Sequence, residues 1–137
     1  LNPPVLVNRK SWQLSASHGG DGCKNAVDGD SKSRWTTNGN QTPNQWFQIE
    51  LPKVSKVSEI ILDSRDSGSD YPRGFEVTVS LDGKGWSKPL AKGSGNTALT
   101  TIGLPRAEAK FIRITQTGSA DGKFWSIHDL QIKGKEL

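Results

Sequence analysis

The chain contains a single cysteine among its 137 residues, which excludes several classes of protein. Cys23 has no partner for an internal disulfide, and no cysteine pair has the spacing of a zinc or iron–sulfur site. No second cysteine or histidine lies beside Cys23 in the sequence to support thiol chemistry. We therefore expect Cys23 to be a small, partly buried filler.

Long apolar runs are also missing. No stretch approaches the roughly 20 apolar residues needed to cross a bilayer. Methionine is absent and hydrophobic residues make up only 32%, whereas the chain has 15 Gly and 7 Pro. This composition favours an all-β fold with many turns. We expect one domain over residues 9–137, preceded by residues 1–8 as the linker remnant of a larger precursor.

The charge balance is mildly basic, with 18 Lys and Arg against 14 Asp and Glu. The net charge of +4 permits an acidic partner such as a sulfated glycan, an anionic lipid or a nucleic acid. The basic residues are spread along the whole chain and are often paired with Asp or Glu, as on an ordinary solvated surface. They form no stripe interleaved with aromatic residues, so we do not expect nucleic acid as a partner.

Short runs of alternating apolar and polar residues recur between turn residues, and no window has a convincing helical period. The clearest run covers residues 75–80, where Phe75, Val77 and Val79 would share one buried face. Further strands are expected at residues 12–17, 45–51, 60–62, near Trp86, and at 99–104, 111–115 and 127–132. Residues 24–27 suit one helical turn at most. About eight strands at this spacing predict a β-sandwich or barrel.

Four segments follow one another in a characteristic order. They are residues 25–35 (NAVDGDSKSRW), 46–51 (WFQIEL), 71–86 (YPRGFEVTVSLDGKGW), and 111–118 (FIRITQTG) followed by 125–130 (WSIHDL). Together they resemble the discoidin family, also called the coagulation factor V/VIII type C domain, which includes the family 32 carbohydrate-binding modules. The resemblance covers about residues 11–132. It implies an eight-stranded jelly-roll β-sandwich, a ligand site on loops at one end and, in many members, a structural calcium.

A calcium site is also chemically reasonable, because Ca²⁺ takes six to eight oxygen ligands in flexible geometry. Asp28 and Asp30 offer carboxylates and carbonyls within one tight turn, and Ser33 adds a hydroxyl and a carbonyl. Asn25 and Asp129 complete the expected ligand set. Asp129 matches a position where relatives commonly carry Glu. The alternative is an Asp-Gly turn without metal. The expected ion would be structural, tying the first loop to the last strand.

Sugar recognition needs an aromatic face that stacks on the ring and fixed polar groups that bind its hydroxyls. We predict that Phe124 or Trp125 stacks on the ligand, with Trp12 and Tyr71 as further candidates. A core position is the alternative for Trp125. The aromatic residues assigned to structure are Trp35, Trp46 and Trp86.

Arg65, Asp66, His18 and Asn38 are the predicted polar contacts. Arg65 resembles a loop arginine that contacts ligand in many relatives, and its fork suits adjacent hydroxyls or a sulfate. A surface salt bridge with a nearby aspartate is the alternative for Arg65. A lone loop histidine such as His18 is more often simply solvated, and Asn38 could equally be a turn residue.

No nucleophile, metal or phosphate-binding signature of an enzyme is present, and only His18 and His128 offer an imidazole base. We therefore expect a non-catalytic carbohydrate-binding module. Its ligand would be a galactose-type, fucosylated or sulfated glycan. Its location would be extracellular or at the cell surface, with the bacterial periplasm as an alternative, and the module would be a monomer. The alternative function is a cell-surface adhesion or anionic phospholipid-binding domain, although the polar loops disfavour membrane insertion.

Overall fold

The computed structural model describes residues 3–137 of the chain. These residues form eight strands and three short 3-10 helices. In chain order the elements are η1 (Arg9–Ser11), β1 (Gln13–Ala16), η2 (Gly20–Ala26), β2 (Trp35–Thr36), β3 (Trp46–Asp63), η3 (Arg65–Ser67), β4 (Phe75–Ser80), β5 (Ala91–Gly93), β6 (Leu99–Gln116), β7 (Ser126–Ile127) and β8 (Asp129–Glu136). Within the described part of the chain, no helix is long and apolar enough to span a membrane.

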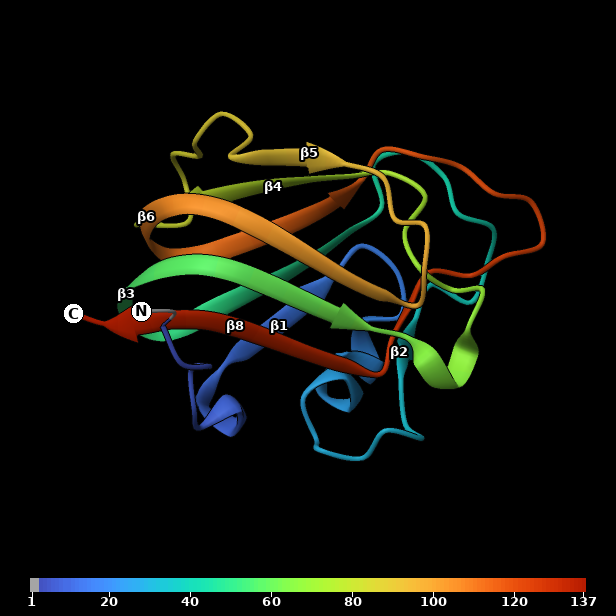
Figure 1. Cartoon of the computed structure of the whole chain (residues 1–137), viewed down its shortest axis with the longest axis horizontal. Helices are drawn as coiled ribbons and strands as arrows, with labels where there is room; N and C mark the ends of the chain where they lie inside the picture. Colours follow the sequence, from blue (N-terminus) through green and yellow to red (C-terminus); the bar gives the residue numbers. More distant parts are fainter. Residues whose placement is uncertain (1–2) are drawn as a thin grey trace.

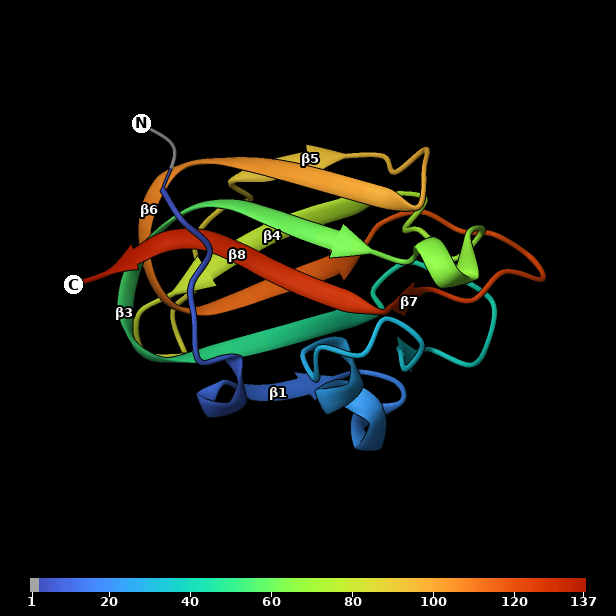
Figure 2. The ribbon, with the colours of Figure 1, turned by 60° about the horizontal axis from the view of Figure 1, so that its bottom comes forward.

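The strands form two layers, because β3 and β6 are long and each contributes to both (Figures 1 and 2). In one layer, β1 pairs with the first part of β3, which pairs with the last part of β6, followed by β4 and β5. In the other layer, the first part of β6 and β8 flank the second part of β3. All pairings are antiparallel, and β2 and β7 form a separate short ribbon. The predicted all-β jelly-roll sandwich is confirmed.

The bends of β3 and β6 explain why the sequence pattern divided each of them into two strands. The ladder between β3 and β6 shifts register between Glu50 and Ser55 and again between Val57 and Glu59. Pro52 lies in β3 at the first shift, and Pro105 lies in β6 opposite the second. A proline donates no ladder hydrogen bond, so within a sheet it is tolerated at edges and bulges. The interruption that looked like a strand end is therefore a bulge within one strand.

The core lies between the two layers and is built from the apolar face of each strand. One layer contributes Phe47, Ile49, Val77, Ile112 and Ile114, and the other contributes Ile60, Leu62, Ile102, Leu130 and Ile132. Cys23 also belongs to this core, as expected of a filler. Trp35 packs edge-on against Phe47 and Trp125, with ring centroids 4.9 Å apart in both pairs.

The structure corrects the assignment of Trp46 and Trp86 as core residues. Both are only partly buried, and both lie against the guanidinium of Arg113, at 4.5 and 4.8 Å from the ring centroids. Arg113 lies on β6 opposite Gln48 of β3, and it donates hydrogen bonds of 2.8 and 2.6 Å to the Gln48 Oε1 atom. The outer face of the first layer thus carries a stacked Trp–Arg–Trp arrangement.

Residues 4–6, which were expected to belong to a linker remnant, are instead paired with β8. The Leu6 amide donates to the Ile132 carbonyl at 2.7 Å, and the Gly134 amide donates to the Pro4 carbonyl at 3.0 Å. Both ends of the described chain therefore meet at β8. Residues 1–2 of the expected linker lie outside the described residues.

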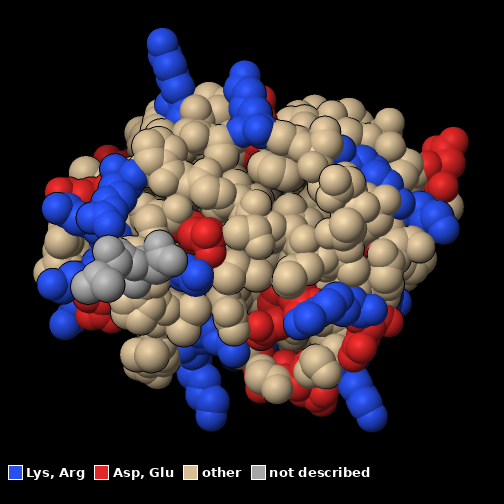
Figure 3. Space-filling model, in the orientation of Figure 1, with Lys and Arg blue, Asp and Glu red and all other residues tan. Residues whose placement is uncertain are grey.

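Charged side chains are dispersed on the face shown in Figure 3. Lys and Arg are separated there by uncharged surface and by Asp and Glu. This agrees with the mixed distribution of charge along the sequence.

Candidate functional site

The loops that carry the predicted ligand contacts lie at one end of the sandwich. In Figure 1 this end, with η3, β2 and the loop before β7, lies opposite the chain termini. Hydrogen bonds join these loops to one another: the Thr37 amide donates to the Trp125 carbonyl, and the Ser126 amide donates to the Asp70 carbonyl. The indole N–H of Trp35 donates to the His18 carbonyl at 2.9 Å. We call this region the loop end.

A buried amide, Gln41, organises the loop end. Its Nε2 atom donates to the carbonyls of Tyr71 and Phe124, at 2.9 and 3.0 Å. Its Oε1 atom accepts from the Arg73 amide at 3.0 Å and from Nε2 of Gln116 at 2.9 Å. The amide thus uses two donors and two acceptor sites, which an amide side chain buried in the core requires. Three segments far apart in the sequence are fixed relative to one another by this one side chain.

Arg34 occupies the centre of the loop end. Its Nη1 atom donates to Oγ of Ser67 at 3.0 Å and to Oδ2 of Asp70 at 3.1 Å. The same Asp70 oxygen accepts from Oγ of Ser126 at 2.6 Å, and the Phe124 ring lies 6.0 Å from the guanidinium carbon. Nη2 and Nε make no hydrogen bond with any residue from 3 to 137. The guanidinium is therefore anchored on one side and keeps donors for a ligand on the other.

The buried ring of His128 supports this anchor. Nδ1 lies 2.7 Å from the Ser31 carbonyl oxygen and Nε2 lies 2.8 Å from Oγ of Ser67. A carbonyl only accepts, so this network assigns the proton to Nδ1 and leaves Nε2 to accept from the Ser67 hydroxyl. Ser67 can then accept from Arg34. The ring is only 4% exposed, so His128 acts here as a positioning residue.

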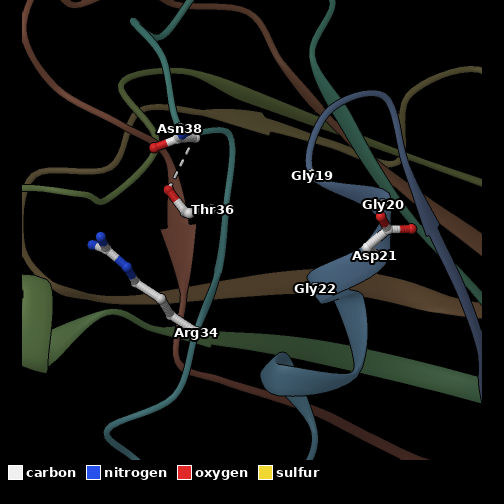
Figure 4. Close-up of a pocket in the computed structure, with 7 residues that line it drawn as sticks. All are labelled: Gly19, Gly20, Asp21, Gly22, Arg34, Thr36 and Asn38. Atoms are coloured by element: carbon white, nitrogen blue, oxygen red, sulfur yellow. Dashed lines mark hydrogen bonds between the residues drawn. The ribbon is translucent and has the colours of Figure 1, made fainter.

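Two hollows flank Arg34. The first, of about 460 Å³, is lined by Gly19, Gly20, Asp21, Gly22, Arg34, Thr36 and Asn38 (Figure 4). The second, of about 520 Å³, is lined by Lys32, Arg34, Asp66, Ser67 and His128. Both fall within the range of about 300–1,000 Å³ that small-molecule sites occupy. Arg34 is the wall that they share.

Gly19 shapes the first hollow. Its φ of 65° lies in the left-handed region that favours glycine, and an added Cβ would overlap the carbonyl oxygen of Thr36. The loop after β1 can therefore lie directly against β2. Figure 4 shows Arg34, Thr36 and Asn38 pointing to one side of this strand. The backbone N–H of Asn38 donates to Oγ1 of Thr36 at 3.2 Å.

Asn38 and Asp66 each line one of the hollows, and Phe124 lies beside Arg34. Arg65 instead lines neither hollow. Its Nε and Nη2 atoms fork onto the Asp63 carboxylate, with a shortest distance of 2.7 Å, and its side chain is 68% exposed. Burial alone would raise the pKa of Asp63, but the hydrogen bonds from Arg65 outweigh it and lower that pKa. The salt bridge left open as an alternative is the observed arrangement.

Trp125 is fully buried, with 0% exposure, so the prediction that it stacks on a ligand is wrong. Trp12 is also buried. Tyr71 is partly exposed, but the Arg73 guanidinium covers its ring at 3.8 Å. His18 is exposed next to the first hollow without lining it, and its Nδ1 atom lies 2.9 Å from Oγ of Ser17.

The predicted calcium ligands separate into two groups. In the first, Oγ of Ser33 lies 2.5 Å from Oδ2 of Asp28 and 3.1 Å from the Asp30 carbonyl oxygen. The Ser33 hydroxyl lies within hydrogen-bonding distance of both acceptors, so three oxygens converge, which is fewer than the six to eight oxygen ligands that Ca²⁺ takes. The hydrogen bond from Ser33 is the main cause that lowers the pKa of Asp28, with the Asp30 amide contributing.

Within the described residues, no hydrogen bond connects Asn25 or Asp129 to these three oxygens, and both side chains have other partners. The Asn25 amide nitrogen donates to the Arg34 carbonyl at 3.1 Å. Asp129 forms an ion pair of 2.6 Å with Arg9, which also donates to the Leu130 carbonyl. Among residues 3–137, no group of three or more His, Cys, Asp or Glu side chains is arranged to hold a metal. A cation would therefore depend largely on carbonyl and hydroxyl oxygens.

The structure is thus a jelly-roll β-sandwich with hydrogen-bonded loops, an anchored arginine and two hollows at one end. The sequence model of the F5/8 type C domain matches residues 9–130. The chain therefore belongs to the F5/8 type C domain family, as the resemblance indicated.

Solved structures with this fold include carbohydrate-binding modules (CBMs) of Clostridium perfringens. The chain is similar to CBM32-3 of a family 31 glycoside hydrolase, with a TM-score of 0.79 and 21% identity over 96% of this chain and 95% of that one. It is also similar to the family 32 CBM of NanJ in complex with galactose. There the TM-score is 0.76 and the identity 25%, over 90% of this chain and 94% of that one.

Relatives of known name differ in how much of their length this chain matches. Galactose oxidase of Gibberella zeae is 25% identical over 88% of this chain, which spans only 19% of that enzyme's length. The human nuclear receptor 2C2-associated protein is 28% identical over 98% of this chain and 95% of its own length. The fold thus occurs both as a minor part of a larger enzyme and as nearly a whole protein.

Proposed function

We propose that this domain is a non-catalytic carbohydrate-binding module that binds a galactose-type glycan at the loop end. The observation that carries the proposal is the anchored, partly exposed guanidinium of Arg34 between two hollows. The similar NanJ module, described in complex with galactose, supports the choice of sugar. Fucosylated and sulfated glycans belong to the same proposal.

Each part of the site has a chemical role toward a sugar. The free Nη2 and Nε donors of Arg34 suit hydroxyl oxygens, and the Asp66 carboxylate and Asn38 amide can exchange hydrogen bonds with further hydroxyls. Phe124 offers an aromatic ring beside Arg34 for the apolar face of a sugar. Since these bonds replace bonds to water, we expect dissociation constants of about 0.1–1 mM for short glycans.

The proposal includes an extracellular or cell-surface location and a role as an accessory part of a larger protein. The similar CBM32-3 comes from a family 31 glycoside hydrolase, and the match to galactose oxidase covers 19% of that enzyme. A weak glycan module is useful in that setting, because tethering raises the local concentration of substrate around an attached domain.

A structural calcium is part of the proposal. Asp28, Asp30 and Ser33 would hold the ion through carboxylate, carbonyl and hydroxyl oxygens. Their loop leads directly into Arg34, so the ion would fix the path of that loop. We expect Ca²⁺ to raise the melting temperature and a chelator to lower it, by mass action. The variant Asp28→Asn should lose this response, and an unchanged wild-type melting temperature in chelator would contradict the ion.

The glycan proposal is tested on an array of galactose-containing, fucosylated and sulfated glycans, followed by titration calorimetry of the best ligand. Arg34→Ala should weaken binding by about tenfold or more, since hydrogen bonds to a charged group are lost. Lys84→Ala, in the exposed turn after β4, is the control and should bind as the wild type does. Near-ultraviolet circular dichroism checks that both variants fold.

Failure on the whole array would contradict the proposal. Vesicles of anionic phospholipid are included because the alternative function predicts binding to them. Vesicle binding combined with silence on the array would support that alternative. Among residues 3–137, the large exposed apolar side chains are Val5, Val7, Leu81, Leu99 and Leu137, and none of them lines either hollow.

A further inference from the structure

The arrangement of the two hollows has a consequence for the length of the ligand. We infer that the loop end recognises two adjoining sugar rings, one in each hollow, with Arg34 contacting both. This inference rests on the proposed function and deepens it, because a site for a single terminal sugar would satisfy that proposal equally well.

The two hollows have one side chain in common. Arg34 lines both hollows, whereas every other lining residue belongs to only one of them. A ligand that occupies one hollow and extends past Arg34 enters the other directly. Both hollows are open to solvent, so a ligand in one of them is free to extend toward the other.

The anchoring of Arg34 is the second argument. Within the described part of the chain only Nη1 makes hydrogen bonds, with Ser67 and Asp70, and Ser67 is held in turn by His128. The guanidinium is planar and rigid, so fixing one nitrogen orients the other two. Neighbouring donors on one plane can bind oxygens of two adjoining rings without a rearrangement of the side chain.

The polar groups of the two hollows form the third argument, since each hollow has its own. The first has Asn38 and Thr36, and the second has Asp66 and Lys32. In Figure 4 the side chains of Asn38 and Thr36 lie on the side of Arg34, whereas the Asp21 carboxylate points away from them. Each hollow therefore keeps donors and acceptors for the hydroxyls of a separate ring.

The test compares methyl β-galactoside with a panel of galactose-containing disaccharides by titration calorimetry. One variant probes each hollow. Asn38→Gly removes a side chain from the first and suits the φ of 52° at this position, and Asp66→Ala removes the carboxylate from the second. The control is again Lys84→Ala. Both residues are exposed, so the variants should fold normally.

At least one disaccharide should bind about tenfold more tightly than the monosaccharide. Each variant should weaken this disaccharide by about three- to tenfold, while only one of them weakens the monosaccharide. Equal affinities for mono- and disaccharides, or a disaccharide insensitive to one of the variants, would overturn the two-ring site and leave the glycan function standing. Absence of binding to every sugar on the array would overturn both.

Discussion

At the scale of single residues, burial controls the chemistry of the one thiol. Cys23 belongs to η2, and its side chain lies in the core and is 2% exposed. Burial, with a smaller contribution from the negative charge of Asp21, raises the pKa of Cys23 to about 11. The thiolate, which is the reactive form, is therefore scarce at neutral pH.

We predict that Cys23 resists alkylation and disulfide exchange in the folded protein. At pH 8, an aromatic disulfide reagent should release little chromophore from the native protein and one equivalent after unfolding in urea. Both the burial and the raised pKa act in this direction. Rapid stoichiometric labelling of the native protein would contradict it.

The carboxyl of Asp28 provides a prediction on pH. Its pKa is lowered mainly by the Ser33 hydroxyl, so its ionised form stabilises the folded state above about pH 4, and this contribution is lost as the pH falls through the folded pKa. Ser33→Ala should raise the Asp28 pKa in an NMR titration without calcium. It should also reduce the acid sensitivity of the melting temperature.

Asp82 is the internal control for that titration. Its pKa is lowered by the backbone amides of Gly85 and Lys84, which Ser33→Ala does not alter. An Asp28 pKa that stays unchanged in the variant would show that the Ser33 hydroxyl is not the cause of the shift.

The sequence identified Asn38 and Asp66 as candidate contacts, because loop residues of these types stand where a binding end is expected. It did not single out Arg34, which looked like one more charge in the segment before Trp35. The role of Arg34 depends on Ser67 and Asp70, which lie 33 and 36 positions away. Only the folded chain brings these partners together, and the same holds for the burial of Trp125.

At the scale of secondary-structure elements, alternation of apolar residues predicted β4 within its observed bounds, residues 75–80. It also located both halves of β3 and β6, although not their continuity, since a bulge and a strand end look alike in sequence. The ribbon of β2 and β7 was missed, because two-residue strands are too short to show a period.

The stacked face of β3 and β6 provides a stability prediction. Arg113 lies between Trp46 and Trp86 and donates twice to Gln48. Arg113→Leu retains an aliphatic side chain of similar width but removes the guanidinium and its interactions. The free energy of unfolding should therefore fall by about 2 kcal/mol. Urea denaturation followed by tryptophan fluorescence measures the change.

Lys92→Ala on β5 is the matched control for this prediction. Lys92 is exposed, and its ion pair with Glu76 is long at 3.8 Å, so its loss should change the stability by less than about 0.5 kcal/mol. If Arg113→Leu were no more destabilising than Lys92→Ala, the stacked face would not contribute to stability.

At the scale of the whole molecule, the jelly roll was predictable because four segments in order identify the family, whereas the position of the chain ends was not. Residues 4–6 lie on β8, and the Leu137 amide donates to the Val54 carbonyl, at the bend of β3. The loop end lies on the far side of the sandwich in Figure 1.

Attachment through the C-terminus should therefore leave glycan binding intact. With Cys23 unreactive, a new cysteine is the only thiol that a biotin–maleimide reagent can modify. Leu137→Cys protein captured on streptavidin should bind glycan at full capacity. Protein captured through Asp121→Cys, in the loop before β7, should lose most of its capacity because the support covers the hollows. Equal capacities would contradict the assigned binding end.

The passage of β3 and β6 through both layers also bears on how the domain opens. The two layers cannot separate unless β3 and β6 lose their pairing in both layers at the same time. Partial opening of the middle of the sandwich is therefore suppressed. Deuterium should consequently enter the central amides of β3 and β6 last. Their common exchange rate would then report the opening of the entire molecule.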